Sequence, residues 1–89
     1  VLTMETLENI LEYLDKSIKN LAKESIENLE IGGELAEILN FLENQFDARL
    51  ENMLVVKKSS ILHLESGMKN KVILRKQTLI ENIRKQYEN

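Results

Sequence analysis

The apolar residues near the start of the chain recur in steps of four and three, which places them on one face of a helix. The stripe consists of Leu7, Leu11, Leu14, Ile18 and Leu21. Thr3 stands where an N-cap is expected, and the pattern predicts a first helix over about residues 3–30. Gly32 and Gly33 then predict a turn, because glycine is the usual residue just past a helix end.

After this turn a second apolar phase can be followed for more than forty residues, in steps of three, four and four. Every eleventh position from Leu39 to Ile83 is apolar, and an eleven-residue repeat suits a long, nearly straight helix. The pattern therefore permits one helix over residues 34–88. The phase runs through Leu39, Leu42, Phe46, Leu50, Met53, Lys57, Ile61, Leu64, Met68, Val72, Arg75, Leu79 and Ile83.

Three features weaken this continuous helix. The phase meets Lys57 and Arg75, residues 55–60 are poor in good helix formers, and Gly67 lies inside the run. A break near residues 57–60 would give helical segments 34–56 and 60–88. We therefore expect a single all-α domain over residues 1–89, either a helical hairpin with a long second helix or an antiparallel three-helix bundle. A further alternative is a small β-hairpin within residues 61–75, turning across residues 66–70.

Charge is divided unevenly along the chain. Residues 1–55 hold twelve acids and four bases, whereas residues 56–89 hold eight bases and three acids. The third segment should therefore lie against the two acidic segments, either in its own chain or in a second copy. These two arrangements are related by domain swapping, and we expect a homodimer. Another protein is an alternative partner.

Many apolar residues lie off the two main stripes, among them Phe41, Val55, Val56 and Ile73. They are too numerous for one helical seam, and a second chain could cover them. The sequence thus predicts a non-enzymatic assembly or interaction module that self-associates by helical packing. The candidate interface follows the long phase and comprises Leu39, Leu50, Ile61, Leu64, Met68, Val72, Leu79 and Ile83.

The basic segment offers a second hypothesis, a small nucleic-acid-binding regulator. A ridge of basic residues beside the apolar stripe could contact phosphates, with Lys58, Lys69 and Lys76 pointing outward. The acidic net charge of −3 and the single aromatic residue of the segment, Tyr87, make this hypothesis the less favoured one. The candidate contacts to an anionic partner are Lys58, Lys69, Lys71, Arg75 and Lys76.

The residues that carry enzyme chemistry are few. The chain has no cysteine and one histidine, His63, which is more typical of a surface residue than of a catalyst or metal ligand. Ser66 and Lys69 match a Ser-x-x-Lys pattern, but the other motifs of that chemistry are missing. We therefore expect no enzyme activity, cofactor or metal. Without a long apolar run or a basic leader, we expect a cytoplasmic protein that does not bind membranes.

Overall fold

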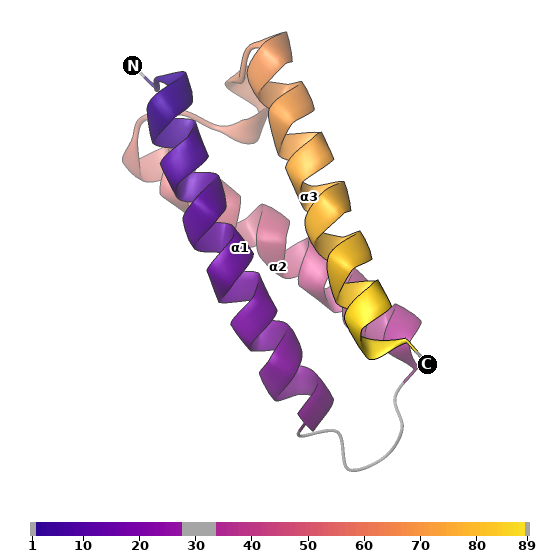
Figure 1. Cartoon of the computed structure of the whole chain (residues 1–89). Coiled ribbons are helices and arrows are strands. Elements are labelled where there is room, and N and C mark those ends of the chain that lie inside the picture. Colours follow the sequence, from indigo (N-terminus) through magenta and orange to yellow (C-terminus); the bar gives the residue numbers. More distant parts are fainter. Residues whose placement is uncertain (1, 28–33, 89) are drawn as a thin grey trace.

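The computed structural model describes residues 2–27 and 34–88, and within them the chain forms three long helices. Helix α1 spans Met4–Glu27, α2 spans Leu35–Val56 and α3 spans Ser66–Tyr87, with a short 3-10 helix, η1, at Ile61–His63. The described residues contain no strand. Helices α1 and α3 run in the same direction and α2 runs against both (Figure 1). The fold is thus the three-helix bundle, one of the two predicted architectures.

The predicted apolar stripes meet in a single core between the helices. Leu7, Leu11, Leu14 and Ile18 of the first stripe are fully buried, and Leu42, Phe46 and Leu50 face them from α2. Helix α3 adds five buried residues, and Leu64 inserts from the segment before it. Burial of these side chains is the main stabilising contribution, because removing apolar surface from water dominates folding. The core side chains are Leu7, Ile10, Leu11, Leu14, Ile18, Ala22, Leu42, Phe46, Leu50, Leu54, Leu64, Met68, Val72, Leu79, Ile80 and Ile83.

The start of α1 carries the N-cap that the sequence predicts. The backbone N–H of Thr6 donates a hydrogen bond of 3.1 Å to Oγ1 of Thr3. This bond satisfies one of the N–H groups that the first turn of a helix leaves without a partner. The prediction at the other end of this segment, residues 28–30 and the turn at Gly32 and Gly33, lies outside the described residues.

The prediction of one continuous helix over residues 34–88 is wrong, because α2 ends at Val56. The N–H of Ser59 donates to the carbonyl of Leu54 at 2.8 Å, and the N–H of Lys58 donates to the carbonyl of Val55 at 2.9 Å. This bond pair is the Schellman motif, which ends a helix through one residue in the left-handed conformation. Lys58 is that residue, with a φ of 60°.

The segment between α2 and α3, residues 57–65, is hereafter called the connector. Beyond the Schellman motif, it is held by further polar contacts and by one apolar anchor. Ile61 N–H donates to Oε2 of Glu51 at 3.0 Å, and Ser60 Oγ lies 2.8 Å from His63 Nδ1. The Ser60 carbonyl accepts from the His63 N–H at 3.1 Å, and Leu64 is buried in the core.

The third helix consequently begins at Ser66, six residues later than predicted. The β-hairpin within residues 61–75 is also wrong, because Val72, a candidate strand residue, lies inside α3 and faces the core. Gly67 lies in the first turn of α3 and does not interrupt a longer helix.

Candidate functional site

The most specific electrostatic contact joins α1 to α3. Glu8 and Asp15 are seven residues apart, which places both carboxylates on the same side of α1. The guanidinium of Arg75 lies between them, with Nη1 2.7 Å from Oε1 of Glu8 and Nε 2.9 Å from Oδ2 of Asp15. Lys71, one turn earlier in α3, brings Nζ to 2.6 Å from Oε2 of Glu8. Four charged side chains thus fix the register of α3 along α1.

These contacts favour the charged forms of the participating groups. Hydrogen bonds from Lys71, and next from Arg75, lower the pKa of Glu8 below its ordinary value. The pKa of Arg75 is raised further, first by its hydrogen bond to Glu8 and then by the one to Asp15. Both shifts are those expected for opposite charges within hydrogen-bond distance. Glu8 and Arg75 therefore stay ionised at neutral pH and hold the two helices together.

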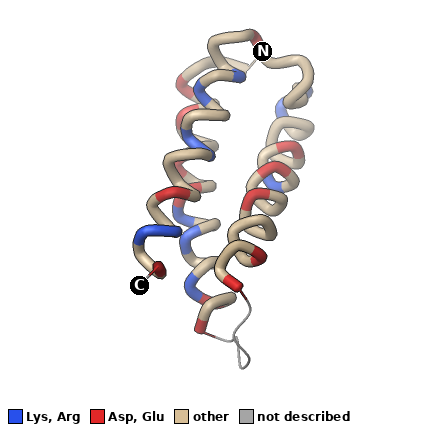
Figure 2. Tube along the Cα trace, turned by 90° about the vertical axis from the view of Figure 1, so that its right-hand side faces the viewer, with Lys and Arg blue, Asp and Glu red and all other residues tan. Residues whose placement is uncertain are grey.

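A further ion pair joins α2 to α3, where Nζ of Lys76 lies 3.1 Å and 3.2 Å from the two carboxylate oxygens of Asp47. Arg84 forms two local ion pairs, one with Glu81 in α3 and one with Glu88 just after the end of α3. Figure 2 shows where the acidic and basic positions lie along the helices. The basic third segment thus pairs with both acidic segments of its own chain, as the charge distribution indicates.

These pairs divide the five candidate contacts to an anionic partner. Lys71, Arg75 and Lys76 bind carboxylates of α1 and α2, so the predicted outward ridge is not continuous. Lys58 and Lys69 are exposed, and the structure gives neither of them an ion pair within the described residues. The outward direction predicted for Lys76 is wrong, because the apolar stripe alone does not indicate where α2 lies.

The candidate interface residues lie mostly in the core of the single chain. Leu50, Leu64, Met68, Val72, Leu79 and Ile83 are buried there, and Leu39 and Ile61 are partly buried against it. In this closed bundle the set does not form an outer surface. A second copy could contact these residues only if α3 left its own α1 and α2.

Other apolar residues remain on the outside of the bundle. Val55 at 59%, Val56 at 78% and Leu62 at 83% exposure flank the connector within eight residues of sequence. Ile73 and Leu74 are exposed on α3, as are Phe41 on α2 and Tyr13 on α1. Most of these residues were predicted from their positions off the main stripes. Leu62 was not among the predicted residues, although it also lies off the long phase, between Ile61 and Leu64.

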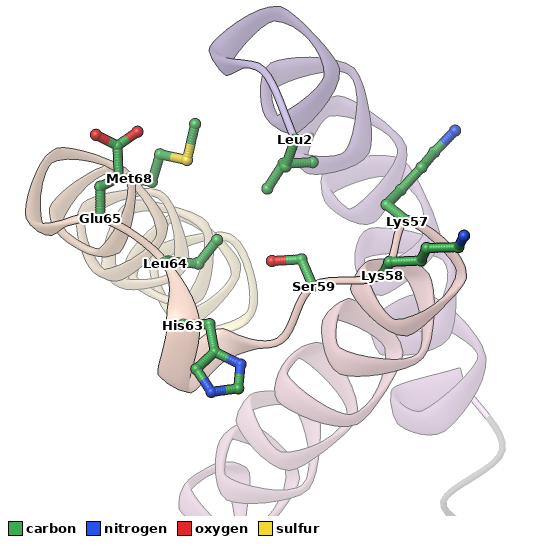
Figure 3. A pocket seen from close by; sticks show the side chains of 8 residues that line it. All are labelled: Leu2, Lys57, Lys58, Ser59, His63, Leu64, Glu65 and Met68. Carbon is green, nitrogen blue, oxygen red and sulfur yellow. The ribbon is translucent and has the colours of Figure 1, made fainter.

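The connector also borders an open pocket of about 600 Å³. Leu2, Leu64 and Met68 contribute its apolar side, and the hydroxyl of Ser59 points toward Leu64 (Figure 3). The side chains of Lys57 and Lys58 extend away from the apolar residues in this view. The pocket has a volume suited to a small ligand, but the polar side chains do not converge on one point, as they do in most binding sites.

The described residues contain no group of three His, Cys, Asp or Glu side chains placed to hold a metal ion. None of the described helices combines the length and the apolar character needed to cross a membrane. Comparison of the chain with protein-family models, with curated proteins and with solved structures gives no match.

Proposed function

We propose that this protein is a non-enzymatic, cytoplasmic assembly module that associates with a second copy of itself. The observation that carries the proposal is the exposure of Val55, Val56 and Leu62 around the connector, at the end of the bundle where α2 stops and α3 begins. Single exposed apolar residues are common on protein surfaces, whereas neighbouring ones are typical of interaction sites. Lys57 and Lys58, which lie between them in sequence, are also exposed.

Three side chains do not make a stable interface by themselves. A specific complex usually buries about 800 Å² on each partner. The contact must therefore include a longer surface, and the apolar residues near the connector would form only one end of it. Helix–helix packing along the length of the bundle is a contact of the right size.

The test is the mass in solution, measured by multi-angle light scattering over a concentration series. Replacing Val56 and Leu62 by Glu should raise the dimer dissociation constant at least tenfold, because the two charges would have to be buried. The double variant should fold normally, since both side chains are exposed in the single chain. Phe41→Glu is the matched control, because Phe41 is also exposed but lies near the start of α2, at the opposite end of that helix from the connector. Equal effects of the two changes would contradict the proposal.

A second candidate function is nucleic-acid binding, favoured by the exposure of Lys58 and Lys69 without an ion pair in the described part of the chain. Phosphate contacts of this kind would make the affinity fall steeply with salt. Fluorescence anisotropy with a generic labelled oligonucleotide should then show weaker binding for Lys58→Glu with Lys69→Glu. Lys23→Glu, an exposed change on α1, should leave the binding unchanged. Salt-independent or absent binding would rule out this candidate.

A further inference from the structure

The connector contains an unfavourable backbone conformation. Lys58 is the one non-glycine residue with a positive φ among the residues that the structure describes. The left-handed region brings Cβ close to the backbone, so that glycine is the usual residue at this place in a Schellman motif. The closed bundle therefore carries a local free-energy cost at the point where the chain turns from α2 toward α3.

The same residues are also compatible with a helix that does not turn. Met53, Lys57, Ile61, Leu64 and Met68 continue the steps of three and four straight through the connector. If residues 57–65 became helical, Lys58 would leave the left-handed conformation, and α2 and α3 would form one rod. The connector sequence can therefore support two conformations, of which the closed one contains the strained residue.

The contacts of α3 with the rest of the bundle can be transferred to another chain. Arg75 and Lys71 bind Glu8 and Asp15 of α1, and Lys76 binds Asp47 of α2. An opened chain would present an acidic groove between α1 and α2 together with a basic α3. A second opened chain has the complementary surfaces, so that two copies can re-form each of these pairs between chains.

We propose that the protein dimerises by exchanging α3 between two copies, with the connector as the hinge and Lys58 as the residue that favours opening. This inference rests on the proposed self-association and specifies its geometry. The exchange buries the same core residues as the closed bundle, and it brings the connectors of the two chains together. Val55, Val56 and Leu62, which are exposed in the closed form, lie in this hinge or directly before it.

The first test compares glycine at two neighbouring positions. Lys58→Gly removes the left-handed penalty from the closed form, whereas Lys57→Gly cannot, because φ of Lys57 is −91°. Either glycine disfavours a helical connector to a similar extent, so the difference between the variants isolates the strain at Lys58. Removing the penalty should favour the closed form about fivefold per chain. Because a dimer contains two chains, Lys58→Gly should raise the dimer dissociation constant about 30-fold relative to Lys57→Gly. Equal dissociation constants for the two variants would overturn the role of Lys58.

The second test detects the exchange directly. Because the chain has no cysteine, Asp47→Cys and Lys76→Cys can be introduced on separate chains, unfolded together, refolded and treated with a short bismaleimide. The proposal predicts a cross-link between the two variants, since residues 47 and 76 would meet across chains. Asn20→Cys mixed with Lys76→Cys is the control for random collision.

The outcomes separate the two proposals. Cross-linking above the control supports exchange of α3. A dimer that gives no cross-link above the control overturns the exchange and leaves self-association in place. A protein that remains a monomer at every concentration overturns both.

Discussion

Replacing Arg75 by Met should weaken the attachment of α3 far more than the loss of a typical surface arginine. The Met side chain keeps the apolar stem of Arg75 but removes both ion pairs to α1 and leaves Asp15 without its partner. The side chains of Arg75 and Asp15 are 26% and 25% exposed, so water can compensate only in part. An exposed ion pair contributes about 0.2–1 kcal/mol. Two partly buried pairs to the same guanidinium should therefore contribute about 1–2 kcal/mol.

The assay is urea unfolding followed by circular dichroism, at one fixed protein concentration because self-association would shift the apparent stability. A domain of this size has an m-value of about 1 kcal/mol/M, so the midpoint should fall by about 1–2 M. In 1 M NaCl the difference from the wild type should shrink, since salt screens partly exposed charges.

Arg84→Met is the matched control for this experiment. Arg84 also contacts two carboxylates, Glu81 and Glu88, but both lie within four residues along the same chain segment. Its loss should leave the midpoint close to that of the wild type, because such local pairs stabilise a helix without joining it to another one. If Arg75→Met shifted the midpoint no more than Arg84→Met, the reasoning about pairs that join α1 to α3 would be refuted.

Three further results are expected. Thr3→Ala removes the N-cap of α1 and should lower the free energy of unfolding by about 1 kcal/mol, measured by urea titration, whereas Thr3→Ser should restore it. Phe46→Ala empties a fully buried position and should cost about 3–5 kcal/mol by the same titration. Because Lys71 and Arg75 lower the pKa of Glu8, its stabilising effect is present above its ordinary pKa of 4.5 and disappears as the pH falls through the lowered value. Urea titrations from about pH 7 to pH 3 should thus show a smaller acid destabilisation for Glu8→Gln than for the wild type.

The sequence was sufficient to predict an all-helical fold, the first helix and most of the core. Leu7, Leu11, Leu14 and Ile18 stand at helical spacing, and the structure buries all four. Burial follows periodicity closely here because each long helix must turn its apolar stripe toward the other two. The N-cap at Thr3 was also predictable. A hydroxyl just before an amphipathic helix can accept a hydrogen bond from the unpaired N–H groups of the first turn.

The connector could not be predicted in the same way. The phase through Lys57, Ile61 and Leu64 is compatible with a continuous helix and with a broken one, because a turn that preserves the phase leaves the pattern unchanged. The poor helix formers at residues 55–60 favoured a break there but did not determine the path of the chain after it. The decisive contacts are tertiary: Glu51 accepts from the N–H of Ile61, and Leu64 enters the core. Such contacts can be identified only when the positions of the helices relative to one another are known.

The candidate sites show the same limitation. The charge asymmetry predicted that the third segment would lie against acidic helices, and Arg75 and Lys76 do so. It could not distinguish which lysines would be neutralised, because this depends on the rotation of α3 about its axis. Lys71 faces α1, whereas Lys69, two residues away, stays exposed. Two residues along a helix correspond to about 200° of rotation, so the side chains of Lys69 and Lys71 point to nearly opposite sides of α3.

The most direct measurement is the absolute mass of the full chain in solution by light scattering, at low and at high salt. We predict a dimer, with twice the mass of the chain, that persists in both conditions, since an interface of buried apolar side chains is little affected by screening. A monomer at all accessible concentrations would contradict self-association and leave the closed bundle as the functional unit.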